Sequence, residues 1–169
     1  LFQGRRSEVG EKNRRVPYAT DRIDAVVLSH AHIDHAGRLP FLVKEGYRGP
    51  IHCTAATRDL CEVMLADSAH IQEKDAEFLQ KRRKEVAEPL YALRDVSTTM
   101  TQMRPQQYGA RFEVVPGVWA RYSDAGHILG SASVALEWEE GSLTRRLGFS
   151  GDVGRSGLAI IRDPEPLEN

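Results

Sequence analysis

The sequence predicts an α/β fold in which β-sheet is flanked by helices. In the first part of the chain, short apolar runs alternate with helical patterns, and this order of strand, helix and strand is typical of α/β proteins. From about residue 111 the period becomes that of strands, with glycine-containing turns between four apolar runs. The length of 169 residues is typical of one domain and is sufficient to form a hydrophobic core.

The first elements are short and follow one another closely. Residues 24–28 (DAVVL) are apolar, β-branched and too few for a helix, so they predict a buried strand. Residues 38–45 predict a short helix that Gly46 ends, with Pro40 tolerated only in its first turn. Residues 51–53 predict a second brief strand after a Gly-Pro turn.

Long helical patterns occupy the middle of the chain. Thr54 or Thr57 can cap a helix that runs past His70 and continues as a charged helix to residue 88. A weaker helical pattern covers residues 93–104, and a proline follows each of the two helices. The basic run at residues 81–84 is typical of a solvated helix face, and an RNA-phosphate patch is the alternative.

Strands are expected in the last third of the chain. The turns between them fit Pro116-Gly117 and Glu140-Gly141. The expected strands cover residues 112–115, 118–122, 133–138 and 146–149.

One stretch concentrates metal-ligating residue types. Three of the six histidines, His30, His32 and His35, lie with Asp34 within six positions. If extended geometry persists past the first strand, then His30, His32 and Asp34 share a face and His35 points elsewhere. Imidazole and carboxylate together suit Zn²⁺, and less specifically Mn²⁺ or Fe. Without cysteine pairs this is not a structural zinc finger, so an open catalytic site is favoured over a polar turn of hydrogen-bonded histidines.

Two later residues can complete such a site. His127 lies between two expected strands, among small residues that let the backbone approach a metal closely. Asp152 follows Ser150-Gly151 at the end of the last expected strand. A carboxylate in that position can bridge two cations, which would otherwise repel each other strongly.

The pattern His30-x-His32-x-Asp34-His35 resembles the signature of the metallo-β-lactamase superfamily. Its branch is indicated by four stretches that are similar to the β-CASP RNA nucleases, at residues 67–77, 89–91, 124–132 and 149–155. The resemblance implies part of an αββα metallo-β-lactamase fold, with a helical insertion around residues 57–105.

The same resemblance implies the site and its chemistry. His30, His32 and His127 would hold one Zn²⁺, Asp34 and His35 a second, and Asp152 would bridge them, with Mn²⁺ as an alternative metal. The implied reaction is hydrolysis of RNA phosphodiester bonds by a hydroxide that both metals activate. Asp34 would orient that hydroxide.

Some expectations stay open at the sequence level. His70 is a candidate for lining a substrate groove, and a surface or core histidine is the alternative. The rival functions are another hydrolase of this fold, acting on a thioester or lactam, and a non-catalytic interaction subunit of the β-CASP type. A homodimer is left open.

The resemblance also suggests that residues 1–169 are part of a longer protein. Leu1-Phe2-Gln3-Gly4 resembles a segment that follows the first aspartate motif in bacterial relatives, with an engineered protease site as the alternative. The first strands and a following β-CASP domain would then lie outside the chain. The superfamily's last histidine ligand also has no candidate after Asp152.

Composition limits the partners and the compartment. The net charge is −1, from 23 basic and 24 acidic residues, so RNA contacts are expected from local patches and not from the whole surface. No apolar run reaches 18 residues, so neither a membrane span nor a signal peptide is expected. Cys53 and Cys61 are expected to be buried thiols in a reducing cytoplasm, with zinc ligation as the alternative.

Overall fold

The structure is a computed structural model that describes residues 1, 12–83 and 88–167. The Leu1-Phe2-Gln3-Gly4 segment and the last residues of the long charged helix therefore lie largely outside the described residues. The chain divides into two compact units, which are described separately below. The first contains residues 1–23, 32–48 and 60–102, and the second contains residues 24–31, 49–59 and 103–169.

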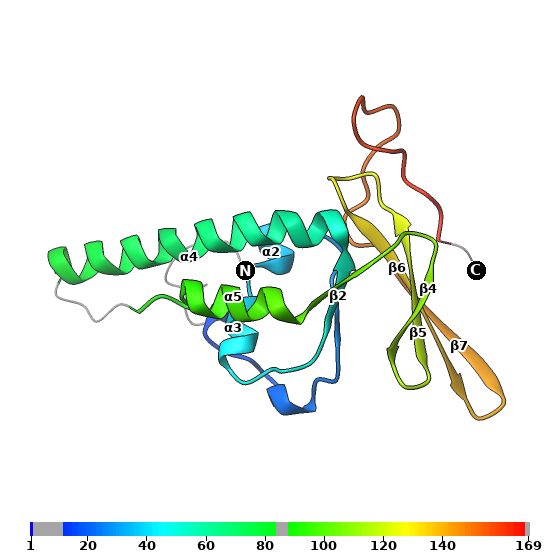
Figure 1. The fold of residues 1–169 in the computed structure, drawn as a ribbon, viewed down its shortest axis with the longest axis horizontal. Coiled ribbons are helices and arrows are strands. Elements are labelled where there is room, and N and C mark those ends of the chain that lie inside the picture. Colours follow the sequence, from blue (N-terminus) through cyan, green and yellow to red (C-terminus); the bar gives the residue numbers. More distant parts are fainter. Residues whose placement is uncertain (2–11, 84–87, 168–169) are drawn as a thin grey trace. The chain divides into compact units, whose positions relative to one another are not determined.

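The first unit is helical (Figure 1). Its helices are the 3₁₀ helix η1 (Thr20–Arg22), α2 (Ile33–Ala36), α3 (Leu39–Lys44), most of α4 (Ala55–Arg83), and α5 (Leu93–Gln102). Pro40 lies in the first turn of α3, as the sequence predicts, and Gly46 follows the helix with φ +109°. Helix α3 packs against α5, and the buried side chains of Phe41, Val43 and Val96 lie in these two helices.

Helix α4 confirms the long central helix. Its first turn is capped by Thr54, whose Oγ1 accepts a hydrogen bond of 3.2 Å from the backbone N–H of Thr57. The buried residues Cys61, Leu65 and Ala69 are spaced by four, which puts them on one helical face. Val63 lies off that face and is 70% exposed.

The chain after α4 returns to the same helix. The hydroxyl of Tyr91 donates to Ser68 Oγ at 2.9 Å, and the backbone N–H of Leu90 donates to Gln72 Oε1 at 2.9 Å. Tyr91 is fully buried. These contacts use two polar side chains of α4 to fix the segment that leads into α5.

The second unit contains two sheets (Figure 1). A parallel sheet has the order β1-β2-β3, with β1 (Val26–Val27), β2 (Ile51–Thr54) and β3 (Met103–Gln106). An antiparallel sheet has the order β4-β5-β6-β7, with β4 (Arg111–Val115), β5 (Val118–Asp124), β6 (Ala132–Glu140) and β7 (Leu143–Phe149). The four strands expected in the last third of the chain are thus confirmed, and both predicted turns carry a glycine of positive φ.

One face of the antiparallel sheet forms the core of this unit. Its buried residues are Phe112, Ala120, Tyr122, Ala132 and Val134, and Val27 of β1 packs against them. The hydroxyl of Tyr122 donates to the carbonyl oxygen of Leu28 at 3.2 Å, so the antiparallel sheet is tied to the residue that follows β1. The α/β class predicted from the sequence is therefore confirmed.

Two local predictions need correction. The helix expected over residues 93–104 ends at Gln102, and Met103–Gln106 forms β3. Pro105 is tolerated in β3 because this strand lies at the edge of its sheet. The extended geometry expected to run through Asp34 ends at His32, since α2 begins at Ile33. Asp34 therefore lies in a helix and does not share an extended face with His30 and His32.

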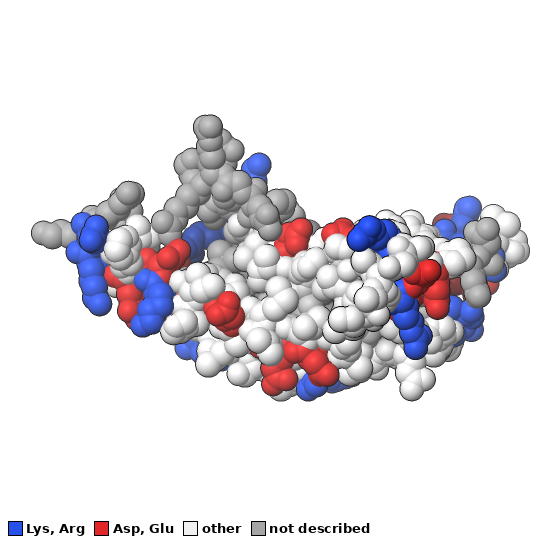
Figure 2. Space-filling model, turned by 90° about the horizontal axis from the view of Figure 1, so that it is seen from above, with Lys and Arg blue, Asp and Glu red and all other residues white. Residues whose placement is uncertain are grey.

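Charged side chains of both signs lie on the face drawn in Figure 2, where blue groups of Lys and Arg and red groups of Asp and Glu stand among mostly uncharged residues. None of the helices that the structure describes combines the length and the apolar character needed to cross a bilayer.

Candidate metal centre

His30 is positioned by the chain that leaves β1. The N–H of Leu28 donates to the carbonyl oxygen of His52 at 2.9 Å, and the N–H of Ala132 donates to that of Ser29 at 2.9 Å. The His30 side chain is fully buried, and its Nδ1 lies 3.1 Å from Ser29 Oγ. This hydrogen bond orients the ring and leaves Nε2 as the nitrogen available to a ligand.

His127 lies in the loop that joins β5 to β6. Gly126 and Gly130 adopt φ values of +63° and +81°, which side chains other than glycine rarely tolerate. Between them, the backbone N–H groups of His127 and Ile128 both donate to Ser131 Oγ, at 3.1 and 3.2 Å. The small residues that the sequence shows around His127 therefore serve to turn the chain tightly.

Asp152 follows the end of β7 and depends on its neighbour Gly151. Gly151 has φ +57°, and a Cβ at this position would lie 2.9 Å from Ser29 Cβ, closer than such atoms approach. The strand end is fixed by Ser133, whose hydroxyl donates to the carbonyl oxygen of Ser150 at 2.9 Å. Glycine here allows Asp152 to lie beside Ser29 and His30.

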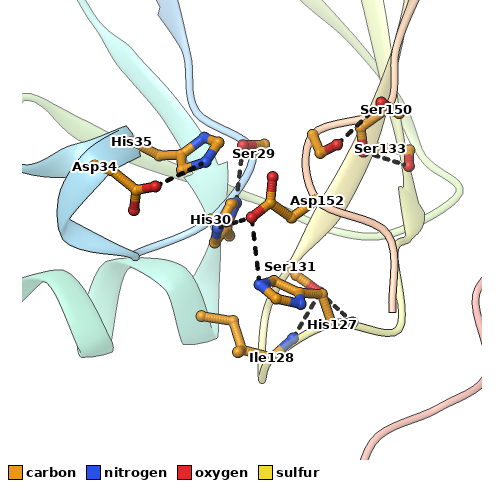
Figure 3. Close-up of polar contacts among 11 residues, drawn as sticks. Ser29, His30, Asp34, His35, His127, Ile128, Ser131, Ser133, Ser150 and Asp152 are labelled. Carbon is orange, nitrogen blue, oxygen red and sulfur yellow. Dashed lines mark hydrogen bonds and ion pairs between the residues drawn. The ribbon is translucent and has the colours of Figure 1, made fainter. Parts of the chain in front are cut away.

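Figure 3 shows His30, His127 and Asp152 pointing toward one another. Asp152 Oδ2 lies 3.8 Å from His30 Nε2 and 3.6 Å from His127 Nε2. The two imidazole rings meet edge to face, with centroids 5.1 Å apart. The side chain of Asp152 is 45% exposed, while that of His30 is buried. The three ligand atoms belong to a group that lies within 4.8 Å and could hold a metal ion.

The donor chemistry of this cluster fits a divalent metal. Two imidazole nitrogens and a carboxylate oxygen are the ligand types of Zn²⁺, and they also serve Mn²⁺ and Fe. Ligand atoms about 2.0–2.1 Å from one tetrahedral ion lie roughly 3.3 Å apart. The observed separations of 3.6 and 3.8 Å are close to that value and too long for direct hydrogen bonds.

The other sequence-predicted residues belong to the first unit. His32 precedes α2, and only Ala31 separates it from His30, so their Cα atoms can be at most about 7 Å apart. Asp34 and His35 are neighbours in α2, with Asp34 Oδ2 3.8 Å from His35 Nε2 (Figure 3). His70 is exposed on α4.

Both cysteines are buried thiols, as predicted. Burial raises the pKa of the Cys53 thiol to about 12, so this thiol stays protonated at neutral pH. A neutral thiol is a poor metal ligand, and neither cysteine belongs to the metal-binding group found among the described residues.

The family of the chain follows from comparison with known proteins. Residues 4–160 match the family model described as "Beta-lactamase superfamily domain". The chain belongs to the beta-lactamase superfamily. Solved metallo-β-lactamases are also similar, for example FEZ-1 of Legionella gormanii, with a TM-score of 0.46 and 12% identity over 92% of this chain and 50% of that one.

Curated relatives of this beta-lactamase superfamily chain are longer. A protein named ribonuclease from Thermus thermophilus is 34% identical over 97% of this chain, which spans 33% of that relative. A protein named transcription termination factor FttA from Lokiarchaeum is 36% identical over 79% of this chain and 20% of its own length. Another FttA, from Cenarchaeum symbiosum, is 37% identical over 83% of this chain and 20% of its own length.

Sequence reasoning missed the residues that support the cluster. Ser29, Ser131 and Gly151 lie in or next to the stretches that carry the candidate ligands, but the sequence does not indicate that they support these ligands. Nothing in the sequence points to Tyr108. The signal for Gly151 and Ser131 was their place next to a candidate ligand or within its loop. No local signal marks Tyr108, because its partner Ser131 is 23 residues away.

Proposed function

We propose that this protein is a metal-dependent ribonuclease that hydrolyses RNA phosphodiester bonds. The proposal is carried by the cluster of His30, His127 and Asp152 in a beta-lactamase superfamily chain whose relative is named ribonuclease. The cluster has the donors for a divalent metal, and the relative's name supplies the substrate class. Because this chain spans a third of that relative, the activity is proposed for the intact protein.

The metal is proposed to be zinc, bound at two neighbouring sites. His30, His32 and His127 would hold the first ion, Asp34 and His35 would contribute to the second, and Asp152 would bridge them. This assignment is supported by the donor types, by the separations around Asp152, and by the single residue between His30 and His32. When bound, the metals would lower the pKa of a water molecule and neutralise charge on the phosphoryl oxygens.

The chain's own side chains have distinct roles in this proposal. Asp34 accepts a hydrogen bond from the attacking water and orients it toward phosphorus. Ser29 keeps the His30 ring fixed through Nδ1, so that Nε2 faces the centre. His70 is exposed on α4 and is retained as a candidate contact for the RNA.

The decisive experiment measures metal content and RNA cleavage on the intact protein. Wild type should contain two zinc ions per chain and cleave RNA, but not a thioester or a lactam. His127→Ala should lose zinc and should also lose RNA cleavage. The matched variant is His70→Ala, which removes an exposed imidazole and should retain its zinc. A wild-type protein without metal would favour a non-catalytic interaction subunit and would contradict the proposal.

A second candidate function comes from the relatives named transcription termination factor, which reach 37% identity with this chain. We propose that RNA cleavage by this protein serves termination of transcription. Purified transcription complexes stalled on a template would test this role. Release of RNA by wild type but not by His127→Ala would support termination that depends on the metal centre, and equal release by both would contradict it.

A further inference from the structure

Three side-chain hydroxyls hold the loop that carries His127. Thr54 and Thr57 donate through Oγ1 to the carbonyl oxygen of Gly130, at 2.7 and 2.8 Å. Tyr108 donates through its phenolic hydroxyl to the carbonyl oxygen of Ser131, at 2.8 Å. These donors, here called the hydroxyl clamp, come from the end of β2, the first turn of α4 and the segment after β3. Thr54 and Thr57 lie 76 and 73 residues from Gly130 in sequence, and Tyr108 lies 23 residues from Ser131.

The two carbonyl groups that the clamp holds are coupled to the backbone of His127. Ser131 Oγ accepts the N–H groups of His127 and Ile128, and the N–H of Ser131 donates to the carbonyl oxygen of Ile128 at 3.0 Å. The carbonyl oxygen of Ser131 also accepts the N–H of Ala125 at 3.1 Å. A shift of Ser131 would therefore move both ends of the loop together with His127.

The packing around the clamp leaves little room for the loop to relax. Thr57 and Ser131 are fully buried, and Thr54 is nearly so. A Cβ on Gly130 would lie 2.5 Å from the backbone nitrogen of Thr57, so the loop passes directly over the first turn of α4. Burial raises the pKa of Tyr108, with Asp124 adding to the effect, so its hydroxyl stays protonated and remains a donor.

We infer that Thr57 and Tyr108 are positioning residues that set the metal affinity of the centre by holding His127 against Asp152 before the metal binds. This inference rests on the proposed function, since it requires that the centre takes a metal. Nε2 of His127 already lies 3.6 Å from Asp152 Oδ2. With the hydroxyl clamp intact, the loop is already ordered before the metal binds. The free energy of metal binding is therefore not reduced by the entropy cost of ordering the loop. Supporting residues of metal ligands typically change affinity by about 10–100-fold when they are removed.

The test uses Zn²⁺ alone, titrated into the intact metal-free protein against a chromophoric chelator. Tyr108→Phe and Thr57→Val each remove one hydroxyl and keep the shape of the side chain. Each should weaken Zn²⁺ binding by about tenfold or more. Thr57→Ser keeps the hydroxyl, so its Kd for Zn²⁺ should lie within about twofold of that of wild type. The visible spectrum of the Co²⁺-loaded protein should change in Tyr108→Phe, since it reports the ligand geometry.

Tyr91→Phe is the matched control, because Tyr91 is also buried and donates its hydroxyl to a side chain far from the loop in sequence, Ser68. It should lower the melting temperature without changing the Zn²⁺ affinity or the Co²⁺ spectrum. Metal affinity equal to wild type in both Tyr108→Phe and Thr57→Val would overturn the inference and leave the proposed function standing. A wild-type protein that binds no Zn²⁺ would instead overturn the proposed function, and the inference with it.

Discussion

Replacing Gly151 by alanine should damage both the stability and the metal centre. The residue has φ +57°, where an alanine costs about 1–2 kcal/mol relative to its preferred conformations. The new Cβ would also lie 2.9 Å from Ser29 Cβ and 3.2 Å from Ser29 Oγ. Relieving such an overlap in a packed site costs about 1–3 kcal/mol. The two effects together predict a loss of about 2–5 kcal/mol in the free energy of unfolding.

Gly141→Ala isolates the backbone part of this cost. Gly141 has a similar φ of +64° in the turn between β6 and β7, and a Cβ there meets nothing within 4 Å. The free energy of unfolding of Gly141→Ala should therefore fall by only about 1–2 kcal/mol. Denaturant unfolding of the metal-free intact protein measures both variants, and the difference between them measures the overlap with Ser29.

The metal affinity supplies an independent readout for the same pair of variants. The overlap pushes Ser29 and the segment of Asp152 apart, and Ser29 also holds the ring of His30. Gly151→Ala should therefore weaken Zn²⁺ binding by at least about tenfold, whereas Gly141→Ala should leave it unchanged. If the two variants unfolded at the same denaturant concentration and bound Zn²⁺ equally, the close approach of Gly151 to Ser29 would have no role in the site.

Three further outcomes are expected. Tyr122→Phe should lower the free energy of unfolding by about 1–2 kcal/mol in denaturant titrations, because the buried carbonyl oxygen of Leu28 loses its 3.2 Å hydrogen bond; an unchanged midpoint would contradict this. Burial lowers the pKa of His52 below its ordinary 6.5, so the unfolded chain binds the proton more tightly and stability is lost as the pH falls below about 6.5. Melting temperatures of the metal-free protein from about pH 7.5 to 5.5 should fall less steeply in His52→Gln than in wild type. Zn²⁺ at about 1,000 times its Kd should stabilise the intact protein by about 4 kcal/mol, an effect that EDTA reverses and His127→Ala lacks.

The fold could be predicted from the sequence where local pattern and tertiary structure agree. The strands of the antiparallel sheet follow from alternating apolar residues and from turns at Gly117 and Gly141. Prediction failed where tertiary contacts override the local pattern. Strand β3 contains Pro105, which usually argues against a strand, but pairing with β2 on one side suffices at a sheet edge. Likewise, His32 marks the end of the extended chain, because α2 begins directly after it.

The candidate metal ligands could be predicted from the sequence because few residue types bind metals. The residues that hold these ligands in place could not be predicted in this way. Histidine is rare in this chain, with six in 169 residues, so a cluster is conspicuous and few residue types can replace it at a metal. His30 and Asp152 are 122 positions apart, yet each is marked by its own neighbours in sequence. Supporting contacts instead use common hydroxyls that donate to backbone carbonyl oxygens, and a carbonyl group carries no sequence signal. The roles of Thr57 and Tyr108 can therefore be recognised only from the three-dimensional structure, which shows their hydrogen bonds to the loop that carries His127. The consequence is testable by comparing variants: substitutions at the ligands should abolish metal binding, whereas substitutions at these supports should weaken it by a graded amount.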